Sequence, residues 1–352
     1  MKFDGIEINK ENFPDKMFRA HVFARDTNLN GYLDPEEVEA TTDLTISGVT
    51  IDDIKGLEHF TNLETLKITY AKLTKIDLSS NTKLKSLIVS NNSLSEIDVS
   101  MLNNLETLDV SFNSLSNLDL SNNNRLKWLN CSSNNIWGTL SLEKNMFLKT
   151  VAFSSNPIRE VKFYCPFLQN LYCGLTNIKE IDFSQFPSLT ILDASFSYLD
   201  SIDLSQNINL EQLDLTGQLS KDLDVSAIDL SNCTNLKAFY SGYNVMDSMI
   251  LPKDSLIKLV LNYNILEELD LSDQSKLQYL DCSNNKLTSI KLPKNSLVTL
   301  NVSNNELTKL DLSEQSNLQH LKCAYNNLSS LNISSKNISK EFNIIFFKNF
   351  TL

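Results

Sequence analysis

The residues best suited to chemistry form the stretch DTNLNGYLDPEE at positions 26–37. Oxygen-bearing side chains recur there at the spacing with which a twelve-residue loop binds calcium, and Gly31 falls where such a loop turns sharply. The sequence therefore predicts a structural calcium site, and its candidate ligands are Asp26, Asn28, Asn30, Tyr32, Asp34 and Glu37.

Only Asp26, Asp34 and Glu37 are charged ligands, which favours weak binding, with a dissociation constant of about 10⁻⁴–10⁻³ M. The alternative is that Gly31 and the Asx residues shape a turn between two helices and hold no metal.

The sequence offers no catalytic constellation beside this loop. It has three histidines, and the expected neighbours of His320 are Thr299 and Lys322. These residues do not make a set of nucleophile, base and orienting group. We therefore do not expect an enzyme.

Composition narrows the possible partners. The chain has 352 residues, is 41% hydrophobic and carries a formal net charge of −12. It can bury a large core, but its acidic surface repels nucleic acid and anionic lipid. No stretch approaches the roughly 20 apolar residues of a membrane-spanning helix. The first residues, MKFDGIEINK, lack the apolar region of a secretory signal, although a removed signal would leave the same picture.

A repeat of about 21 residues organises most of the chain. One unit reads LQYLDCSNNKLTSIKLPKNS and follows the pattern L-x-x-L-x-[LVC]-x-x-N-x-L. Burying its six inward side chains yields about 10 kcal/mol, whereas ordering it costs about 20–40 kcal/mol, so stability must be shared between stacked units. The opening leucines are Leu63, Leu84, Leu105, Leu126, Leu148, Leu168, Leu189, Leu210, Leu236, Leu256, Leu277, Leu297 and Leu318.

This pattern resembles the bacterial leucine-rich-repeat family, in the short form typical of internalin-type surface proteins. The resemblance covers roughly residues 42–335 and implies a right-handed solenoid, mainly β, with a parallel sheet on its concave side. The segment before it resembles the helical caps of related proteins, some of which carry an EF-hand-like loop.

We therefore expect three segments: a helical N-terminal cap at 1–41, the solenoid at 42–335 and a C-terminal cap at 336–352. The first cap should contain an amphipathic helix within residues 12–25 and a short second helix within residues 36–44. The far cap should use the apolar residues Ile338, Phe342, Ile344, Ile345, Phe346, Phe347 and Phe350.

The third and fifth residues of each repeat should face outward on the concave side. Aromatic residues there are typical of binding hot spots, with a packing role as the alternative. The candidate ligand-binding residues are Trp128, Asn170, Tyr172, Asp193, Asp214, Tyr240, Lys258, Tyr279, Asp281, His320 and Lys322.

The eighth position places further aromatics at the edge of the sheet: Phe112, Phe196, Tyr243, Tyr263 and Tyr325. We expect Phe112 and Phe196 to pack over the neighbouring turn. The one long step, from Leu210 to Leu236, inserts residues around Gly217–Asp224, either as a bulge that carries specificity or as a tolerated accident.

Three other residue types recur. Cysteines Cys131, Cys173, Cys282 and Cys323 should be core residues. Cysteines that lie two repeats apart in the sheet are separated by about 9–10 Å, which is too far for a disulfide. Aspartates on the return side, such as Asp77 and Asp98, should face solvent. The asparagine of each repeat should satisfy backbone groups at the bend. Ala71, Thr176, Ser197 and Gln218 replace it, and we expect looser packing around the sixth to eighth repeats.

The leading hypothesis is a non-enzymatic, monomeric module that binds a protein or glycan through its concave face and is secreted or displayed on a bacterial surface. The alternatives are a calcium-responsive regulator and a cytoplasmic scaffold or host-directed effector. Nucleic acid and a transmembrane segment are not expected.

Overall fold

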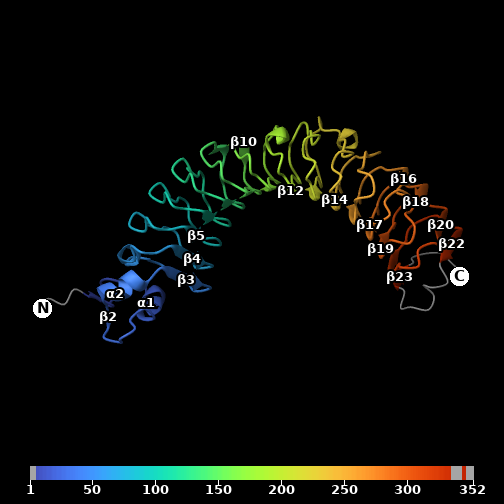
Figure 1. The fold of residues 1–352 in the computed structure, drawn as a ribbon. Coiled ribbons are helices and arrows are strands. Elements are labelled where there is room, and N and C mark those ends of the chain that lie inside the picture. Colours follow the sequence, from blue (N-terminus) through green and yellow to red (C-terminus); the bar gives the residue numbers. More distant parts are fainter. Residues whose placement is uncertain (1–4, 334–342, 346–352) are drawn as a thin grey trace. The chain divides into compact units, whose positions relative to one another are not determined.

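The computed structural model describes residues 5–333 and 343–345. The chain divides into two units, Met1–Ile178 and Lys179–Leu352. Each unit consists of short strands that return once per repeat to a parallel sheet, and the expected parallel-sheet solenoid with little helix is confirmed (Figure 1).

The first unit begins with small elements and continues as a parallel sheet. The small elements are β1 (Ile6–Glu7), α1 (Lys16–Phe23), β2 (Tyr32–Leu33), α2 (Pro35–Ala40) and η1 (Leu57–His59). The sheet follows sequence order through β3 (Asp43–Ser47), β4 (Thr65–Thr69), β5 (Ser86–Ile88), β6 (Thr107–Asp109), β7 (Trp128–Asn130), β9 (Thr150–Ala152) and β11 (Asn170–Tyr172). On the return side, β8 (Gly138–Leu142) pairs with β10 (Ile158–Phe163).

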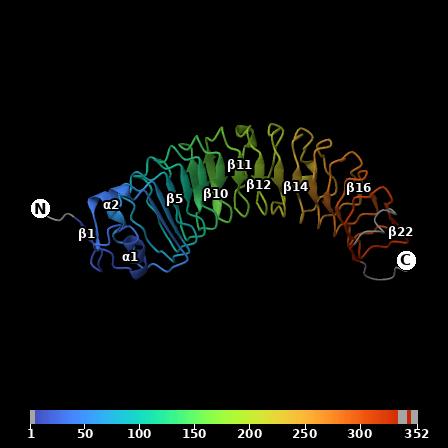
Figure 2. The ribbon, with the colours of Figure 1, turned by 60° about the horizontal axis from the view of Figure 1, so that its bottom comes forward.

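The second unit repeats this arrangement (Figure 2). Its sheet contains β12 (Ile191–Asp193), β13 (Gln212–Asp214), β14 (Ala238–Tyr240), β15 (Lys258–Val260), β17 (Tyr279–Asp281), β19 (Thr299–Asn301), β21 (His320–Lys322) and β23 (Asn343–Ile345). The return side carries η2 (Phe183–Gln185), η3 (Val225–Ala227), β16 (Glu268–Asp270), β18 (Ser289–Lys291), β20 (Lys309–Leu312) and β22 (Ser330–Ile333).

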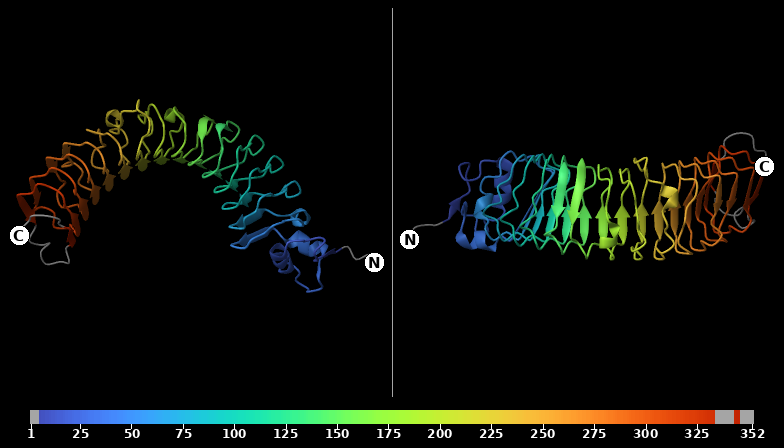
Figure 3. Two further views of the ribbon diagram at one scale, coloured as in Figure 1. Left: turned by 180° about the vertical axis from the view of Figure 1, so that it is seen from behind. Right: turned by 90° about the horizontal axis from the view of Figure 1, so that it is seen from above.

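The register of the strands places equivalent positions of consecutive repeats opposite each other. Leu66, Leu87, Leu108 and Leu129 lie opposite one another on consecutive strands, and all are fully buried. Residues on either side of each buried leucine are half-buried and face outward, as the period of two in a strand predicts. Within each unit the short strands of the sheet run side by side (Figure 3). The opening leucines of the repeats are likewise buried.

The repeated asparagine joins consecutive turns. In the first unit, Asn134 Nδ2 donates to the carbonyl oxygens of Val110, in the preceding repeat, and of Cys131, both at 3.0 Å. Its Oδ1 accepts from the Leu115 amide at 3.0 Å. The predicted role of this amide, which is to satisfy backbone groups at the bend, is confirmed.

Where the asparagine is replaced, other side chains restore some of the hydrogen bonds. Gln218 Nε2 donates to the Ala194 carbonyl at 2.8 Å, and its Oε1 accepts from Ser197 Oγ at 2.8 Å. Thr176 Oγ1 donates to the Cys173 carbonyl at 2.8 Å. The hydrogen bonds are therefore replaced only in part: Gln218 keeps the bond to the preceding repeat, whereas Thr176 bonds within its own turn.

A second ladder of amides lies on the return side, three residues before the opening leucine. Asn123 Nδ2 donates to the Val99 and Leu102 carbonyls at 2.9 and 3.0 Å. Asn81, Asn145 and Asn207 make equivalent bonds. Cys165 and Cys233 occupy this same position, each with its Sγ 3.8 Å from a carbonyl oxygen of the preceding turn.

All six cysteines are buried and free of disulfides, which confirms the prediction made for Cys131, Cys173, Cys282 and Cys323. Burial raises the pKa of Cys131 to about 12 and that of Cys323 to about 11. These thiols therefore stay protonated at neutral pH and act as small core residues.

The recurrent aspartates on the return side have a structural role that the sequence interpretation missed. Asp77 Oδ1 accepts from the Ser79 amide at 2.9 Å, and Asp98 binds Ser100 in the same way. These hydrogen bonds lower the pKa of both carboxyls. The side chains are exposed, as expected, but they also close the turn that follows them.

The N-terminal helices cover the start of the first unit. Asp15 caps α1, because its Oδ1 accepts from the Met17 and Phe18 amides at 2.8 Å. Phe13 is fully buried against Gly56, where an added Cβ would lie 2.2 Å from the ring. The second helix ends at Ala40, earlier than expected, since the chain enters β3 at Asp43.

The expected C-terminal cap at 336–352 lies outside the described residues apart from β23. This strand pairs with β21, with Asn343 opposite His320, and so adds one more strand to the sheet.

Candidate functional site

The second half of the loop at 26–37 is held by secondary structure, since it contains β2 and the start of α2. β2 pairs with β1 in antiparallel fashion, with Leu33 opposite Ile6, and Leu33 is fully buried. Gly31 has φ +85°, a conformation that favours glycine. Its amide donates to Asp26 Oδ2 at 2.8 Å, which fixes the first candidate ligand beneath the loop.

The remaining candidate ligands bind one another or the backbone. Glu37 Oε1 accepts from the amide of Thr27 at 2.6 Å and from its hydroxyl at 2.7 Å, while Oε2 accepts from the Asp34 amide at 3.0 Å. Asp34 Oδ2 accepts from Asn28 and Asn30 at 2.8 and 3.1 Å. Burial raises the pKa of Glu37, but these hydrogen bonds outweigh it and leave that pKa below its usual value.

This arrangement partly fits calcium. The oxygen donors are of the right type and order, and the backbone at Gly31 already turns. However, within the described part of the chain no three acidic, histidine or cysteine side chains gather closely enough to hold a metal. Calcium would have to draw Glu37 away from Thr27 and Asp34, so the turn-forming interpretation also stands.

The predicted ligand-binding residues of the first unit come together on one part of the sheet. Trp128 lies on β7, and Asn170 and Tyr172 lie on β11, with β9 between these two strands. All three side chains are half-buried. They are less exposed than the sequence suggested.

In the second unit, Lys258 connects two of the predicted aromatics. Its Nζ lies 5.0 Å from the centre of the Tyr240 ring and 4.9 Å from that of Tyr279. The lysine thus bridges the strands on either side of its own, an arrangement favoured by cation–π attraction. Nothing in the one-dimensional pattern indicates this contact, since it depends on side chains two repeats apart.

The remaining candidates of this unit are also placed on the outward face. Asp193 lies opposite Asp214, and Tyr240 lies next along that row. Burial raises the pKa of Asp214, and the neighbouring Asp193 adds to this effect. Asp281 Oδ2 accepts from Asn301 at 3.1 Å. His320 and Lys322 are exposed on β21.

The residues at the eighth position adopt a left-handed backbone. Phe112, Phe196, Tyr243, Tyr263 and Tyr325 have φ between 49° and 57°. Phe112 is 57% exposed, so its predicted packing over a turn is wrong, whereas the Phe196 ring does lie against Gly217. Tyr243 and Tyr263 stack with ring centres 4.4 Å apart.

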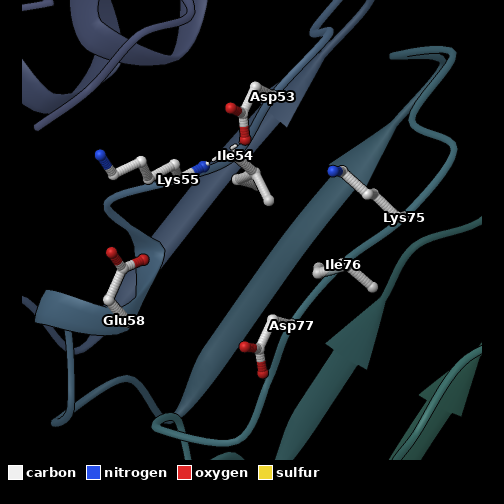
Figure 4. Close-up of a pocket in the computed structure, with 7 residues that line it drawn as sticks. All are labelled: Asp53, Ile54, Lys55, Glu58, Lys75, Ile76 and Asp77. Carbon is white, nitrogen blue, oxygen red and sulfur yellow. Dashed lines mark hydrogen bonds between the residues drawn. The ribbon is translucent and has the colours of Figure 1, made fainter. Parts of the chain in front are cut away.

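A pocket on the return side of the first unit contains several charged groups but no reactive set (Figure 4). Asp53 Oδ1 accepts from the Lys55 amide at 2.9 Å, and Glu58 accepts from the Gly56 amide at 2.7 Å. Lys55 Nζ donates to the Glu11 carbonyl at 2.7 Å. These side chains bind nearby backbone groups, and Figure 4 shows them spread apart around the pocket.

Comparison with known proteins agrees with this architecture. Residues 13–134 match the family model described as the leucine-rich-repeat domain of the endo-β-N-acetylglucosaminidase EndoS, and residues 276–294 match the general leucine-rich-repeat model. A search of curated protein sequences found no match.

Solved structures give wider coverage. The functional domain of InlJ from Listeria monocytogenes, which includes a cysteine ladder, is 28% identical, with a TM-score of 0.80 over 92% of this chain and 76% of that one. YopM, a leucine-rich effector protein from Yersinia pestis, is 26% identical, with a TM-score of 0.66 over 90% of this chain and 84% of YopM. Internalin InlF from Listeria monocytogenes shares the fold at 19% identity, with a TM-score of 0.62 over 99% of this chain and 100% of InlF.

The repeat, the sheet and these similarities identify a leucine-rich-repeat solenoid protein. Within that class the chain is similar to bacterial internalins, as its likeness to InlJ shows. In the described residues no helix has the length and apolar character needed to cross a bilayer.

Proposed function

We propose that the chain is a non-enzymatic binding module, secreted or displayed by a bacterium, that holds a protein partner on the outward face of its sheet. The observation that carries this proposal is the cluster of Tyr240, Lys258 and Tyr279 on β14, β15 and β17. Aromatic and cationic side chains on a rigid sheet supply contact area at a low cost in conformational entropy.

The arrangement of this cluster supports recognition of an acidic group. Lys258 is held between two rings and takes part in no ion pair among the described residues. Its charge is therefore available to a carboxylate, while both tyrosines offer apolar faces beside it. A partner that places an acidic residue next to an apolar one would match both features.

The test is capture of proteins from solubilised host-cell surface fractions by the immobilised chain. We expect Tyr240→Ala and Lys258→Ala to remove the captured partner while leaving the melting temperature nearly unchanged. Lys253→Ala, an exposed lysine on the return side of the same unit, is the matched control and should capture normally. Undiminished capture by Lys258→Ala would refute the outward face as the binding site.

Similarity to YopM favours a host-directed effector as the second candidate for cellular role. Fractionation of the producing bacterium, followed with an antibody against the chain, separates the secreted or surface-displayed module from the host-directed effector. A surface-displayed or secreted module would appear in the surface or medium fractions. Delivery into contacted host cells would support the second.

We also propose that the loop at 26–37 binds calcium as a structural ion in the N-terminal cap. The order of its oxygen donors and the turn at Gly31 support this proposal. When bound, calcium would supply a charge that draws Asp26, Asp34 and Glu37 together and stiffens the junction between α1 and α2.

A further inference from the structure

The outward face of the first unit carries a second type of surface, distinct from the lysine cluster. Six side chains on β7, β9 and β11 form two rows: Trp128–Thr150–Asn170 and Asn130–Ala152–Tyr172. The two aromatic residues therefore occupy one pair of opposite corners and the two asparagines the other. Small residues form the floor between them. We call this group the amide–aromatic patch.

Several hydrogen-bond donors of the patch point to the surface without a protein acceptor. Asn130 Oδ1 accepts from the Ser132 amide at 3.0 Å, which fixes the side chain and leaves its Nδ2 available. In the described part of the chain, neither the Trp128 indole nitrogen nor the Tyr172 hydroxyl has a hydrogen-bond partner. Asn170 Nδ2, by contrast, donates to Thr150 Oγ1 at 3.1 Å and is held in place.

The six side chains are also uncharged, although the chain has 31 basic and 43 acidic residues. The neighbouring carboxylate in this row is Asp109 on β6, which lies opposite Asn130 and caps Ser111. A charged peptide would find no opposite charge on these six side chains. An aliphatic surface would cover the Asn130 amide and leave it without an acceptor, which costs free energy. The ligand that fits must combine apolar faces with many neutral acceptors.

An uncharged sugar ring has both properties. Its C–H groups carry slight positive charge and lie favourably on the negative face of an aromatic ring. Its hydroxyls accept hydrogen bonds from amide, indole and phenol groups. Trp128 and Asn170 stand on strands about 10 Å apart, at twice the usual strand spacing, with only Thr150 between them.

We propose that the amide–aromatic patch is a subsite for a neutral oligosaccharide, of which one ring packs on Trp128 and another on Tyr172 while its hydroxyls accept from Asn130. This goes beyond the proposed protein-binding function and does not depend on it. The two surfaces share no residue, so either can fail alone.

The tryptophan content allows a direct test. The chain has two tryptophans, and Trp137 is 70% exposed at a position outside the patch. In a Trp137→Phe background, Trp128 is the single indole fluorophore of the folded chain. We would titrate this protein with N-acetylchitotriose, cellotriose and maltotriose, and with trigalacturonate as an anionic control.

At least one neutral trisaccharide should give a saturable change in Trp128 emission that trigalacturonate does not. Tyr172→Ala and Asn130→Asp should each weaken the affinity about tenfold. Asn130→Asp keeps the side-chain shape and the cap on Ser132, because Asp109 makes the same cap in the preceding repeat. Tyr164→Ala, which removes a tyrosine that is 58% exposed on the return side, is the matched control and should bind normally.

The proposal is overturned if none of the three neutral sugars saturates at millimolar concentration, or if trigalacturonate binds equally well. It is also overturned if Tyr172→Ala and Asn130→Asp bind like the parent. Circular dichroism of each variant separates loss of binding from loss of fold. Tyr240→Ala should leave sugar binding intact even where it removes a protein partner.

Discussion

Asp214 lies directly opposite Asp193 on the neighbouring strand, and neither takes part in an ion pair among the described residues. Each carboxylate caps its own turn, Asp193 through Ser195 and Asp214 through Thr216. Like charges facing each other across a sheet destabilise it. The pair therefore reduces folding stability at neutral pH.

Replacing Asp214 with Asn should stabilise the chain at pH 7 by up to about 1 kcal/mol. The cap should survive, because Asn301 makes the same bond to Ser303 at 3.2 Å. Burial raises the pKa of Asp214 in the folded state, so the cost of its charge is present above that pKa and disappears as the pH falls. Thermal melts from pH 7 down to pH 3 should show that the extra stability of Asp214→Asn over the parent shrinks as the pH falls. If Asp214→Asn is equally more stable at every pH, or less stable than the parent, Asp193 and Asp214 do not repel each other.

Replacing Asn134 with Ala should cost about 2–3 kcal/mol of unfolding free energy. The change removes two donated bonds and one accepted bond between turns and leaves buried backbone groups unsatisfied. Asn135→Ala is the matched control, because that neighbour is exposed, and it should change stability by less than about 0.5 kcal/mol. Urea denaturation measures both, and equal losses would show that the ladder contributes little.

Two glycines with similar backbones should respond differently to alanine. Gly48 and Gly56 both have positive φ, at +72° and +103°, but only Gly56 has a neighbour, the Phe13 ring, in the way of a Cβ. Gly48→Ala should cost about 1–2 kcal/mol from backbone strain alone. Gly56→Ala should cost about 1–3 kcal/mol more, because the cap must shift. Melting temperatures that fall equally would mean that Phe13 does not hold the cap.

Calcium binding by the cap should be visible in calorimetry as a single weak site, with a dissociation constant of about 10⁻⁴–10⁻³ M. Asp26→Ala should abolish the heat, whereas Glu36→Gln, which removes a charge next to a candidate ligand, should retain it. Bound calcium should also raise the melting temperature by mass action. Absence of heat, or heat that survives Asp26→Ala, would leave Gly31 and the Asx residues as a metal-free turn.

The sequence was sufficient for the architecture because a single period determines which side chains face inward. The opening leucines and the outward position of Trp128 and Tyr240 followed from that period. The αL conformation at Phe112 and the exposure of its ring did not, because they depend on how the chain leaves the strand. The bridging of Tyr240 and Tyr279 by Lys258 depends on rotamers across three strands, which no single repeat encodes.

One structural signal was present in the sequence and was missed. Asn81, Asn123, Asn145 and Asn207 all stand three residues before an opening leucine, and Cys165 and Cys233 share that position. The period therefore indicates a second ladder, and the two cysteines that had no assigned role belong to it.

The two ladders have a mechanical consequence. Each amide ties a turn to the one before it, so the amide bonds of a turn reach only its immediate neighbours. Under a stretching force applied at a terminus, the solenoid should peel turn by turn rather than rupture as a whole. Each event would release about 21 residues of chain, the step between Leu84 and Leu105. Such a molecule yields gradually and can lengthen under load while its remaining turns stay folded.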